Sequence, residues 1–184
     1  MSPFRPDLVD CWLFRVPLTA RGIAHPEILL LRRAPGRIVP GLWQCVSGSL
    51  ESGERLALGA LREVQEETGF AGDDIEAVYD LDLVNQFHEP TMDGIVTAAV
   101  FAARVHPHAE PVLSQEHDAA RWVAVPDAHD EVIWPGYRTA IERIRDDLAV
   151  PERAAWFELT RSGDRKSVEE RGNHAVDQPR TTRW

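Results

Sequence analysis

Long apolar runs and cysteine-rich motifs are both missing from this sequence. Only two cysteines occur, Cys11 and Cys45, each in an otherwise apolar segment. They predict reduced core thiols in a cytoplasmic protein, with a buried disulfide or a reactive thiol as the alternative. No stretch approaches the roughly 20 apolar residues of a membrane span. The apolar run within MSPFRPDLVDCWLFRVPLT is too short for a signal peptide and contains acids. We therefore expect no membrane partner.

Motifs of several other functional classes are absent too. No serine lies in a nucleophile elbow, no glycine-rich phosphate loop occurs, and no segment repeats. His106 and His108 flank a proline without a third ligand nearby, which argues against zinc. With 30 acidic and 20 basic residues, the net charge is −10. This balance argues against a nucleic-acid partner and suits a site that recruits cations.

The segment GSLESGERLALGALREVQEETGF, residues 48–70, carries the main functional signal. On a helix with about 100° per residue, Glu66 and Glu67 lie about 60° and about 40° to either side of Glu63, so three carboxylates share one arc. The flank facing away from them is apolar and predicts a core-facing stripe, made of Ala57, Ala60, Leu61, Val64 and Thr68. Ser52 and Gly53 mark the expected start of this helix, and Gly69 its end.

Carboxylates gathered on one turn repel one another and raise one another's pKa values. Hard divalent cations remove this problem, because carboxylate oxygens are the ligands that Mg²⁺ and Mn²⁺ prefer. The sequence therefore predicts a Mg²⁺ site, with Mn²⁺ as the alternative ion. The competing interpretation is a solvated acidic helix face. The glycine at each end and Arg62 within the acid cluster argue against it.

The pattern G-x5-E-x7-R-E-(apolar)-x-E-E-x-G-(apolar) is satisfied at every position of this segment. It resembles the signature box of the Nudix hydrolases, and the resemblance extends over roughly residues 9–148. It implies an α/β fold, the Nudix α/β/α sandwich with a mixed β-sheet between helices. It also implies hydrolysis of a nucleoside diphosphate linked to another group.

Apolar periodicity divides the chain into expected elements and two regions. We expect strands at 7–18, 27–33, 43–47, 75–86, 95–105 and 120–125, and a second helix at 136–148. The segment 34–42 is rich in proline and glycine and predicts a loop. Residues 1–158 are expected to form the Nudix domain, with an added helical turn within 151–157. Residues 159–184 contain few apolar side chains and are expected to be a disordered tail.

The Nudix resemblance implies roles for the box residues. Glu63, Glu66 and Glu67 would hold one or more Mg²⁺ ions, with the backbone carbonyl of Ser47 as a further ligand. Glu54, expected one turn into the helix, would complete the metal shell or orient a ligand. Arg62 would pair with a box carboxylate and fix its rotamer, the alternative being an ordinary surface pair with Glu66.

Two glutamates are candidates for the general base that activates water. Glu63 lies at the centre of the box and is the preferred base. Glu116 lies in a loop before the strand at 120–125, and some Nudix enzymes carry a metal-binding or basic glutamate in that loop. We expect Glu116 to be a metal ligand or the alternative base, and the competing interpretation is a solvated loop acid.

Residues outside the box bear on the substrate. The Trp43-Gln44 strand, the Glu116-containing loop and Trp134 before the last helix resemble nucleoside triphosphate and dihydroneopterin triphosphate pyrophosphatases. The expected partner is thus a small nucleotide or pterin substrate, cleaved to a monophosphate and pyrophosphate. Trp43 or Trp134 could stack on a flat ring, Gln44 could read a ring edge, and Arg33 could contact phosphates. For each aromatic residue, the competing interpretation is ordinary core packing.

Two alternative functions stay open at this point. One is a Nudix hydrolase of a nucleotide sugar or a dinucleotide polyphosphate. The other is a non-catalytic Nudix-like sensor that binds a nucleotide without hydrolysing it. The intact box disfavours the sensor, because binding alone does not need all four glutamates.

Overall fold

Strand β1 (Leu8–Arg15) lies at the centre of the sheet and is buried on both faces. Its side chains alternate between two core clusters: Trp12 and Phe14 belong to one, and Val9, Cys11 and Leu13 to the other. Such a nearly continuous apolar run is typical of a strand covered on both sides. β1 pairs in parallel with β8 and antiparallel with β4 and β6.

The computed structural model describes residues 6–19, 22–23, 25–90, 93–167 and 170. Besides β1, its strands are β2 (Leu18–Thr19), β3 (Gly22–Ile23), β4 (Glu27–Arg33), β5 (Trp43–Gln44), β6 (Val46–Ser49), β7 (Ile75–Glu89), β8 (Gly94–Val105), β9 (His117–Ala124) and β10 (Glu158–Leu159). Its helices are α1 (Leu56–Thr68), η1 (Gly72–Asp74), α2 (Val125–Glu131), α3 (Pro135–Arg143), the π-helical η2 (Ile144–Leu148) and α4 (Pro151–Ala154).

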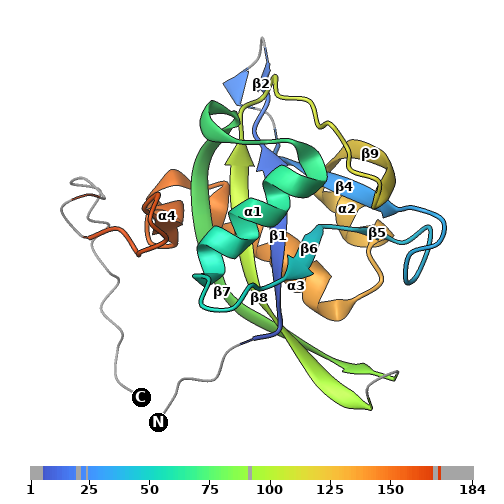
Figure 1. Cartoon of the computed structure of the whole chain (residues 1–184). Coiled ribbons are helices and arrows are strands. Elements are labelled where there is room, and N and C mark those ends of the chain that lie inside the picture. Colours follow the sequence, from blue (N-terminus) through green and yellow to red (C-terminus); the bar gives the residue numbers. More distant parts are fainter. Residues whose placement is uncertain (1–5, 20–21, 24, 91–92, 168–169, 171–184) are drawn as a thin grey trace, which may run out of the picture.

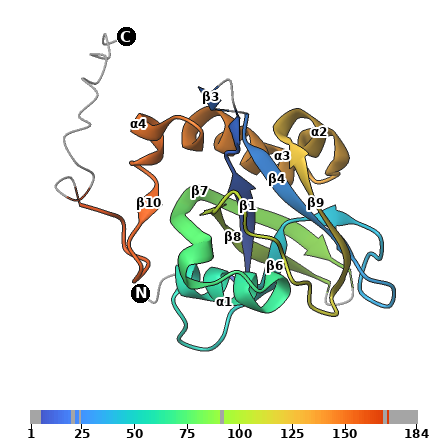
Figure 2. The ribbon, with the colours of Figure 1, turned by 90° about the horizontal axis from the view of Figure 1, so that it is seen from above.

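The main sheet is mixed and lies between two helical layers. Its strand order is β10-β7-β8-β1-β4-β5, with β6 paired to β1 and β9 paired to β4. Helix α1 covers one face, and α2 and α3 cover the other (Figure 1, Figure 2). The expected α/β/α sandwich with a mixed sheet is therefore confirmed. None of the helices in the described part of the chain is long and apolar enough to cross a membrane.

Several boundaries differ from the sequence-based expectation. The helix of the box begins at Leu56, so Glu54 lies in the turn before the helix and not one turn into it. The reason is local: Gly53 has a positive φ and Arg55 is extended. The sequence analysis also missed α2, a seven-residue helix that begins beside a proline. Such a segment is too short to show helical periodicity.

The expected boundary between residues 158 and 159 passes through strand β10. Leu159 is buried and pairs with Val78 of β7, and it also bridges to Arg165. Arg55, just before α1, forms an ion pair with Asp164 at 2.5 Å. The first part of the expected tail therefore packs on the domain. The rest of that segment lies outside the described residues, apart from residue 170.

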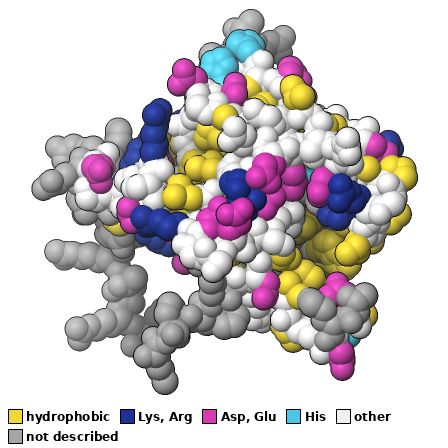
Figure 3. Space-filling view, in the orientation of Figure 1, with side chains coloured by type: hydrophobic (Ala, Val, Ile, Leu, Met, Phe, Trp, Pro, Cys, Tyr) yellow, Lys and Arg dark blue, Asp and Glu magenta, His cyan; other side chains and the backbone are white. Residues whose placement is uncertain are grey.

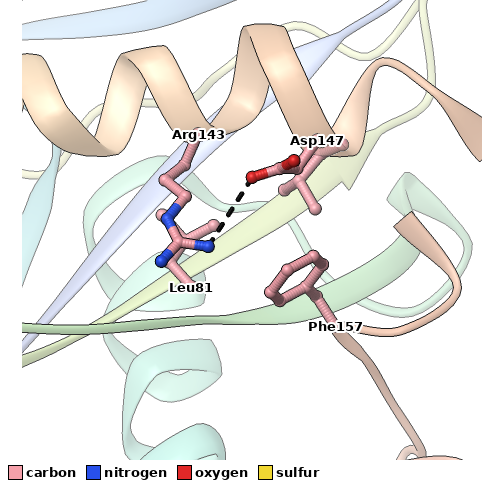
Figure 4. Close-up of a pocket in the computed structure, with 5 residues that line it drawn as sticks. Leu81, Arg143, Asp147 and Phe157 are labelled. Atoms are coloured by element: carbon pink, nitrogen blue, oxygen red, sulfur yellow. Dashed lines mark ion pairs between the residues drawn. The ribbon is translucent and has the colours of Figure 1, made fainter. Parts of the chain in front are cut away.

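The C-terminal elements pack on one side of the sheet around a shallow surface hollow. It is lined by Leu81, Arg143, Asp147, Leu148 and Phe157 (Figure 4). Arg143 approaches Asp147 to 3.6 Å, and its guanidinium carbon lies 5.7 Å from the centre of the Phe157 ring. These contacts join α3, η2 and the chain after α4, and the backbone N–H of Asp80 in β7 donates to the Phe157 carbonyl at 2.9 Å.

Cys11 and Cys45 are both buried and free. Burial raises the pKa of each thiol, because the thiolate form would lose its hydration. Both therefore act as small core side chains, as the sequence predicts, and neither is an activated nucleophile.

Core packing gives a first prediction. Leu30 is fully buried, whereas Ile38 is 74% exposed in the loop between β4 and β5. Leu30→Ala should lower the free energy of unfolding by about 2–5 kcal/mol, because it removes buried contacts and leaves a cavity. Ile38→Ala is the matched control and should change it by less than about 0.5 kcal/mol. Urea unfolding followed by circular dichroism measures both. Equal effects of the two substitutions would contradict the assigned core.

Candidate active site

One guanidinium joins three of the four box glutamates. Arg62 donates from Nε to Glu54 at 2.9 Å, and from Nη1 to Glu63 at 2.8 Å and to Glu66 at 3.2 Å. Its Nη2 donates to the backbone carbonyl of Ser49 at 2.9 Å. The predicted pairing of Arg62 with box carboxylates is thus present. It reaches well beyond a surface pair with Glu66, because it ties α1 to the preceding turn and to β6.

Two glycines make room for these carboxylates. A Cβ at Gly48 would lie 1.9 Å from the carboxyl carbon of Glu63, and a Cβ at Gly59 would lie 2.8 Å from an oxygen of Glu54. Gly48 lies in β6, so the Glu63 carboxylate rests directly against the strand that leads into the box. The first glycine of the motif is therefore required for space at this point.

The fourth box glutamate is held differently. Glu67 Oε1 accepts the backbone N–H of Ser47 at 3.3 Å. Glu67 Oε2 lies 2.6 Å from His117 Nε2. Both side chains are almost fully buried. The structure therefore brings Ser47 and Glu67 together, while turning Glu67 away from the group around Arg62.

A buried acid that the sequence analysis did not select lies beside Ser47. Asp10 is in register with Ser47 across the β1–β6 pair and is 3% exposed. Asn85 of β7 donates to Asp10 Oδ2 at 2.8 Å, and a Cβ at Gly136 would lie 2.1 Å from Asn85 Oδ1. The sequence did contain a signal for Asp10, because it is a single acid within an otherwise apolar strand. An acid is rarely buried in such a strand without a polar partner.

Burial changes the acidity of two of these groups. Desolvation raises the pKa of Glu63, and the hydrogen bond and charge of Arg62 oppose that rise. Desolvation also raises the pKa of Asp10, opposed by hydrogen bonds from Asn85 and Ser47. A carboxylate with a raised pKa is a better proton acceptor near neutral pH. Glu63 is the one of the two that belongs to the carboxylate cluster.

The donor set can be compared with the needs of a divalent cation. Within the described residues, no three acidic, histidine or cysteine side chains already converge as a cation cage. Glu54, Glu63 and Glu66 face Arg62, and Glu67 faces His117. The ligand chemistry nevertheless fits, because four carboxylates accompany one guanidinium and all donors are hard oxygens. Glu66 is 57% exposed and makes the longest of the Arg62 contacts, so it is the acid with most freedom to turn.

Glu116 lies next in the chain to His117, and its side chain forms an ion pair with Arg37 at 3.1 Å. Its backbone carbonyl accepts the N–H of Ala34 at 2.9 Å. Two loops, the one after β4 and the one before β9, are therefore joined beside the site. The Glu116 carboxylate is held by Arg37 and does not contact the box glutamates.

The four predicted substrate-binding residues divide into two groups. Trp43 has the guanidinium carbon of Arg121 at 4.1 Å from its ring centre. Gln44 is buried, and Arg33 donates to the Gln44 side chain at 3.4 Å and to the Ile38 carbonyl at 2.7 Å. These three are engaged with other protein groups. Trp134, just before α3, is 45% exposed and is the one with a large accessible ring.

The face of the molecule that carries α1 has a charged part and an apolar part. Acidic side chains gather around a basic one over α1, and apolar side chains appear beside them toward the β7–β8 hairpin (Figure 3). Exposed apolar residues of the hairpin include Val84, Phe87 and Ile95. An acidic cluster thus lies next to an apolar surface.

Comparison with known proteins agrees with this geometry. Residues 15–144, well over half of the chain, match the Nudix domain family. The chain belongs to the Nudix family. The matched residues contain the whole box, residues 48–70.

Solved structures share the Nudix fold. A putative Nudix hydrolase from Listeria monocytogenes is 24% identical, with a TM-score of 0.64 over 79% of this chain and 95% of that one. The Ap4A hydrolase of C. elegans is 19% identical, with a TM-score of 0.63 over 77% and 96%. The dihydroneopterin triphosphate pyrophosphohydrolase of E. coli is 25% identical, with a TM-score of 0.59 over 74% and 94%.

A curated relative is longer than this Nudix protein. An octanoyltransferase of Myxococcus xanthus is 39% identical over 119 residues, which are 64% of this chain and 32% of that protein. The chain thus spans about a third of the length of that relative. The similarity establishes a shared segment and not a shared activity.

The contact between Gly48 and Glu63 gives a second prediction. Gly48→Ala should lower kcat by about 10²-fold, because the added methyl group displaces the Glu63 carboxylate and a shift of about 1 Å can have that effect. Thermal unfolding should still be cooperative. Ser49→Ala is the control on the same strand, because Arg62 contacts only its backbone carbonyl, and it should keep the wild-type rate. An unaffected Gly48→Ala enzyme would contradict the assigned contact.

The buried acid gives a third prediction. Because the pKa of Asp10 is raised above its ordinary value of 3.8, the folded protein keeps a proton that the unfolded chain releases. Wild-type stability therefore falls as pH rises from about 3.8 through the raised pKa. Asp10→Asn cannot ionise and avoids this loss. In urea unfolding with a chelator present, the stability of Asp10→Asn relative to wild type should increase between pH 4 and pH 8. A constant difference would contradict the burial argument.

Proposed function

We propose that this Nudix protein is a Mg²⁺-dependent pyrophosphohydrolase that cleaves a nucleoside or pterin triphosphate to a monophosphate and pyrophosphate. The observation that carries the proposal is the arrangement of the box glutamates. Three of them surround Arg62, and the fourth, Glu67, accepts the backbone N–H of Ser47 in β6, the strand that leads into the box. Such a dense negative site attracts divalent cations and, with them, a polyphosphate.

The box residues and Ser47 would have two roles, cation binding and the positioning of carboxylates. Glu63, Glu66, Glu67, Glu54 and the carbonyl of Ser47 would hold the cation. When bound, Mg²⁺ neutralises phosphate charge and lowers the pKa of a bound water. Arg62 is a positioning residue, since its five donated hydrogen bonds fix carboxylates and backbone. Its own pKa is raised, chiefly by the hydrogen bond to Glu54, so it stays charged throughout.

Glu63 is the preferred general base. Its carboxylate accepts a proton from water as the water oxygen attacks phosphorus, and the bond from that phosphorus to the leaving phosphate oxygen breaks. Desolvation favours this role, because it raises the pKa of Glu63 toward the working pH. Glu116 is the alternative base or a further cation ligand. That role requires it to leave its ion pair with Arg37.

A flat heterocycle fits the apolar surface beside the acids. Trp134 is 45% exposed and Phe87 is 44% exposed, and stacking of a base on an aromatic ring contributes about 1–3 kcal/mol. Trp43, Gln44 and Arg33 would need new partners before they could contact a substrate. The similarity to the E. coli dihydroneopterin triphosphate pyrophosphohydrolase supports the same substrate class.

A substrate panel tests this proposal. Nucleoside triphosphates, dihydroneopterin triphosphate, a nucleotide sugar, ADP-ribose and a dinucleotide polyphosphate are each incubated with Mg²⁺ and the pure protein. Pyrophosphate release from a triphosphate is the expected result. Cleavage of only the nucleotide sugar or the dinucleotide would favour the alternative hydrolases. Binding without product throughout would favour a sensor.

Substitution of the base is the fourth prediction. Glu63→Gln should keep the fold and lower kcat by about 10²–10⁴-fold, the usual scale for loss of a general base. Glu67→Gln should instead raise the Mg²⁺ concentration needed for half-maximal rate, along with a lower rate. Steady-state kinetics over a Mg²⁺ titration separates the two. Near-normal turnover by folded, Mg²⁺-saturated Glu63→Gln would exclude Glu63 as the base.

A further inference from the structure

The contact between Glu67 and His117 joins the last turn of α1 to the first residue of β9. The distance from His117 Nε2 to Glu67 Oε2 is 2.6 Å, and the exposed fractions of the two side chains are 1% and 5%. The second oxygen, Glu67 Oε1, accepts the N–H of Ser47. Both oxygens of this carboxylate therefore have a donor, and the donors come from two different strands.

The orientation of the His117 ring toward Glu67 leaves its other nitrogen without a hydrogen bond to any described residue, which is energetically unfavourable. A carboxylate oxygen accepts, so Nε2 carries the donated hydrogen. The other ring nitrogen, Nδ1, is buried and has no hydrogen-bond partner among the described residues. A buried polar atom without a partner is unfavourable, and an apolar ring of the same shape would avoid the penalty. Packing alone therefore does not explain a histidine at this position.

Main-chain hydrogen bonds hold the loop before β9 in place without help from the His117 side chain. Ser114 donates its N–H to the carbonyl of Glu67 at 3.1 Å, and Val112 donates to the carbonyl of Thr68 at 2.8 Å. His117 is also in register with Arg33 across the β4–β9 pair. The loop before β9 is thus fastened to the end of α1 by main-chain bonds. Changing the side chain at 117 should alter the carboxylate contact and leave the loop attached.

We propose that His117 is a positioning residue that holds the Glu67 carboxylate in the orientation needed to bind a divalent cation. The inference rests on the proposed function, because that function assigns Glu67 to the cation. Arg62 fixes Glu54, Glu63 and Glu66, and His117 does the same for Glu67. Hydrogen bonds to a metal-binding carboxylate from such outer groups commonly change metal affinity by about 10–100-fold.

Cation affinity of the full chain tests the proposal directly. Mn²⁺ binding is measured without substrate, by electron paramagnetic resonance of free Mn²⁺ or by calorimetry. His117→Phe keeps the ring and removes the donor, so its Mn²⁺ Kd should rise by about 10–100-fold. His117→Gln keeps a donor at a similar reach and should recover most of the affinity. Glu67→Gln combined with His117→Phe should weaken binding no further than Glu67→Gln alone.

A second histidine–glutamate pair gives a matched control, and a further substitution of His117 is available if the first does not fold. His129 Nε2 lies 3.2 Å from Glu142 on the α2–α3 side of the sheet, so His129→Phe removes a comparable pair and should leave Mn²⁺ affinity unchanged. If His117→Phe does not fold, His117→Asn replaces it. Asn is too short to reach Glu67, so it should bind Mn²⁺ more weakly than His117→Gln.

The outcomes separate this inference from the proposed function. Wild-type Mn²⁺ affinity in folded His117→Phe, or equal affinities in His117→Asn and His117→Gln, would overturn the positioning role even with a lower melting temperature. Absence of turnover across the substrate panel, together with His117-dependent Mn²⁺ binding, would contradict the hydrolase proposal and leave the positioning role intact.

Discussion

The site depends on one electrostatic constraint: carboxylates of like charge are held within a few ångströms of each other. Arg62 offsets the repulsion among three of these carboxylates, because a planar guanidinium donates several hydrogen bonds in fixed directions. It also donates to the carbonyl of Ser49, so the same group aligns β6, the following turn and α1. A lysine could not reproduce this geometry, since its ammonium is a point donor. The positions of Glu54, Glu63 and Glu66 are therefore set by this one group.

A second set of contacts comes from parts of the chain far from the box. His117 of β9 contacts Glu67, and Asn85 of β7 contacts Asp10 of β1. Asn85 in turn lies against Gly136 at the start of α3. Asp10 is in register with Ser47, and Glu67 accepts the Ser47 N–H, so both acids lie beside β6, from which the chain enters the box. The fold therefore contributes buried partners that neutralise, orient or desolvate the acids, while the box contributes the acids themselves.

The sequence was sufficient for the parts that depend on local spacing. The helix of the box, the apolar stripe of α1 and the bounds of β4 follow from periodicity. Of the three carboxylates predicted to share one arc, Glu63 and Glu66 both contact Arg62, whereas Glu67 contacts His117. Features that depend on tertiary contacts could not be obtained in this way. The burial of Glu67 and Gln44 depends on strands distant in sequence. So does the stacking of Arg121 on Trp43. Leu159 is a similar case, because the polar sequence around it does not predict a strand that pairs with β7.

The most direct test of this account is a crystal structure of the protein grown with Mn²⁺, with the ion located by its anomalous scattering. The account predicts a peak among the carboxylates of Glu63, Glu66 and Glu67 beside the Ser47 carbonyl, with Arg62 still bound to Glu54. A peak elsewhere on the molecule, or saturating Mn²⁺ without a peak at the box, would contradict it.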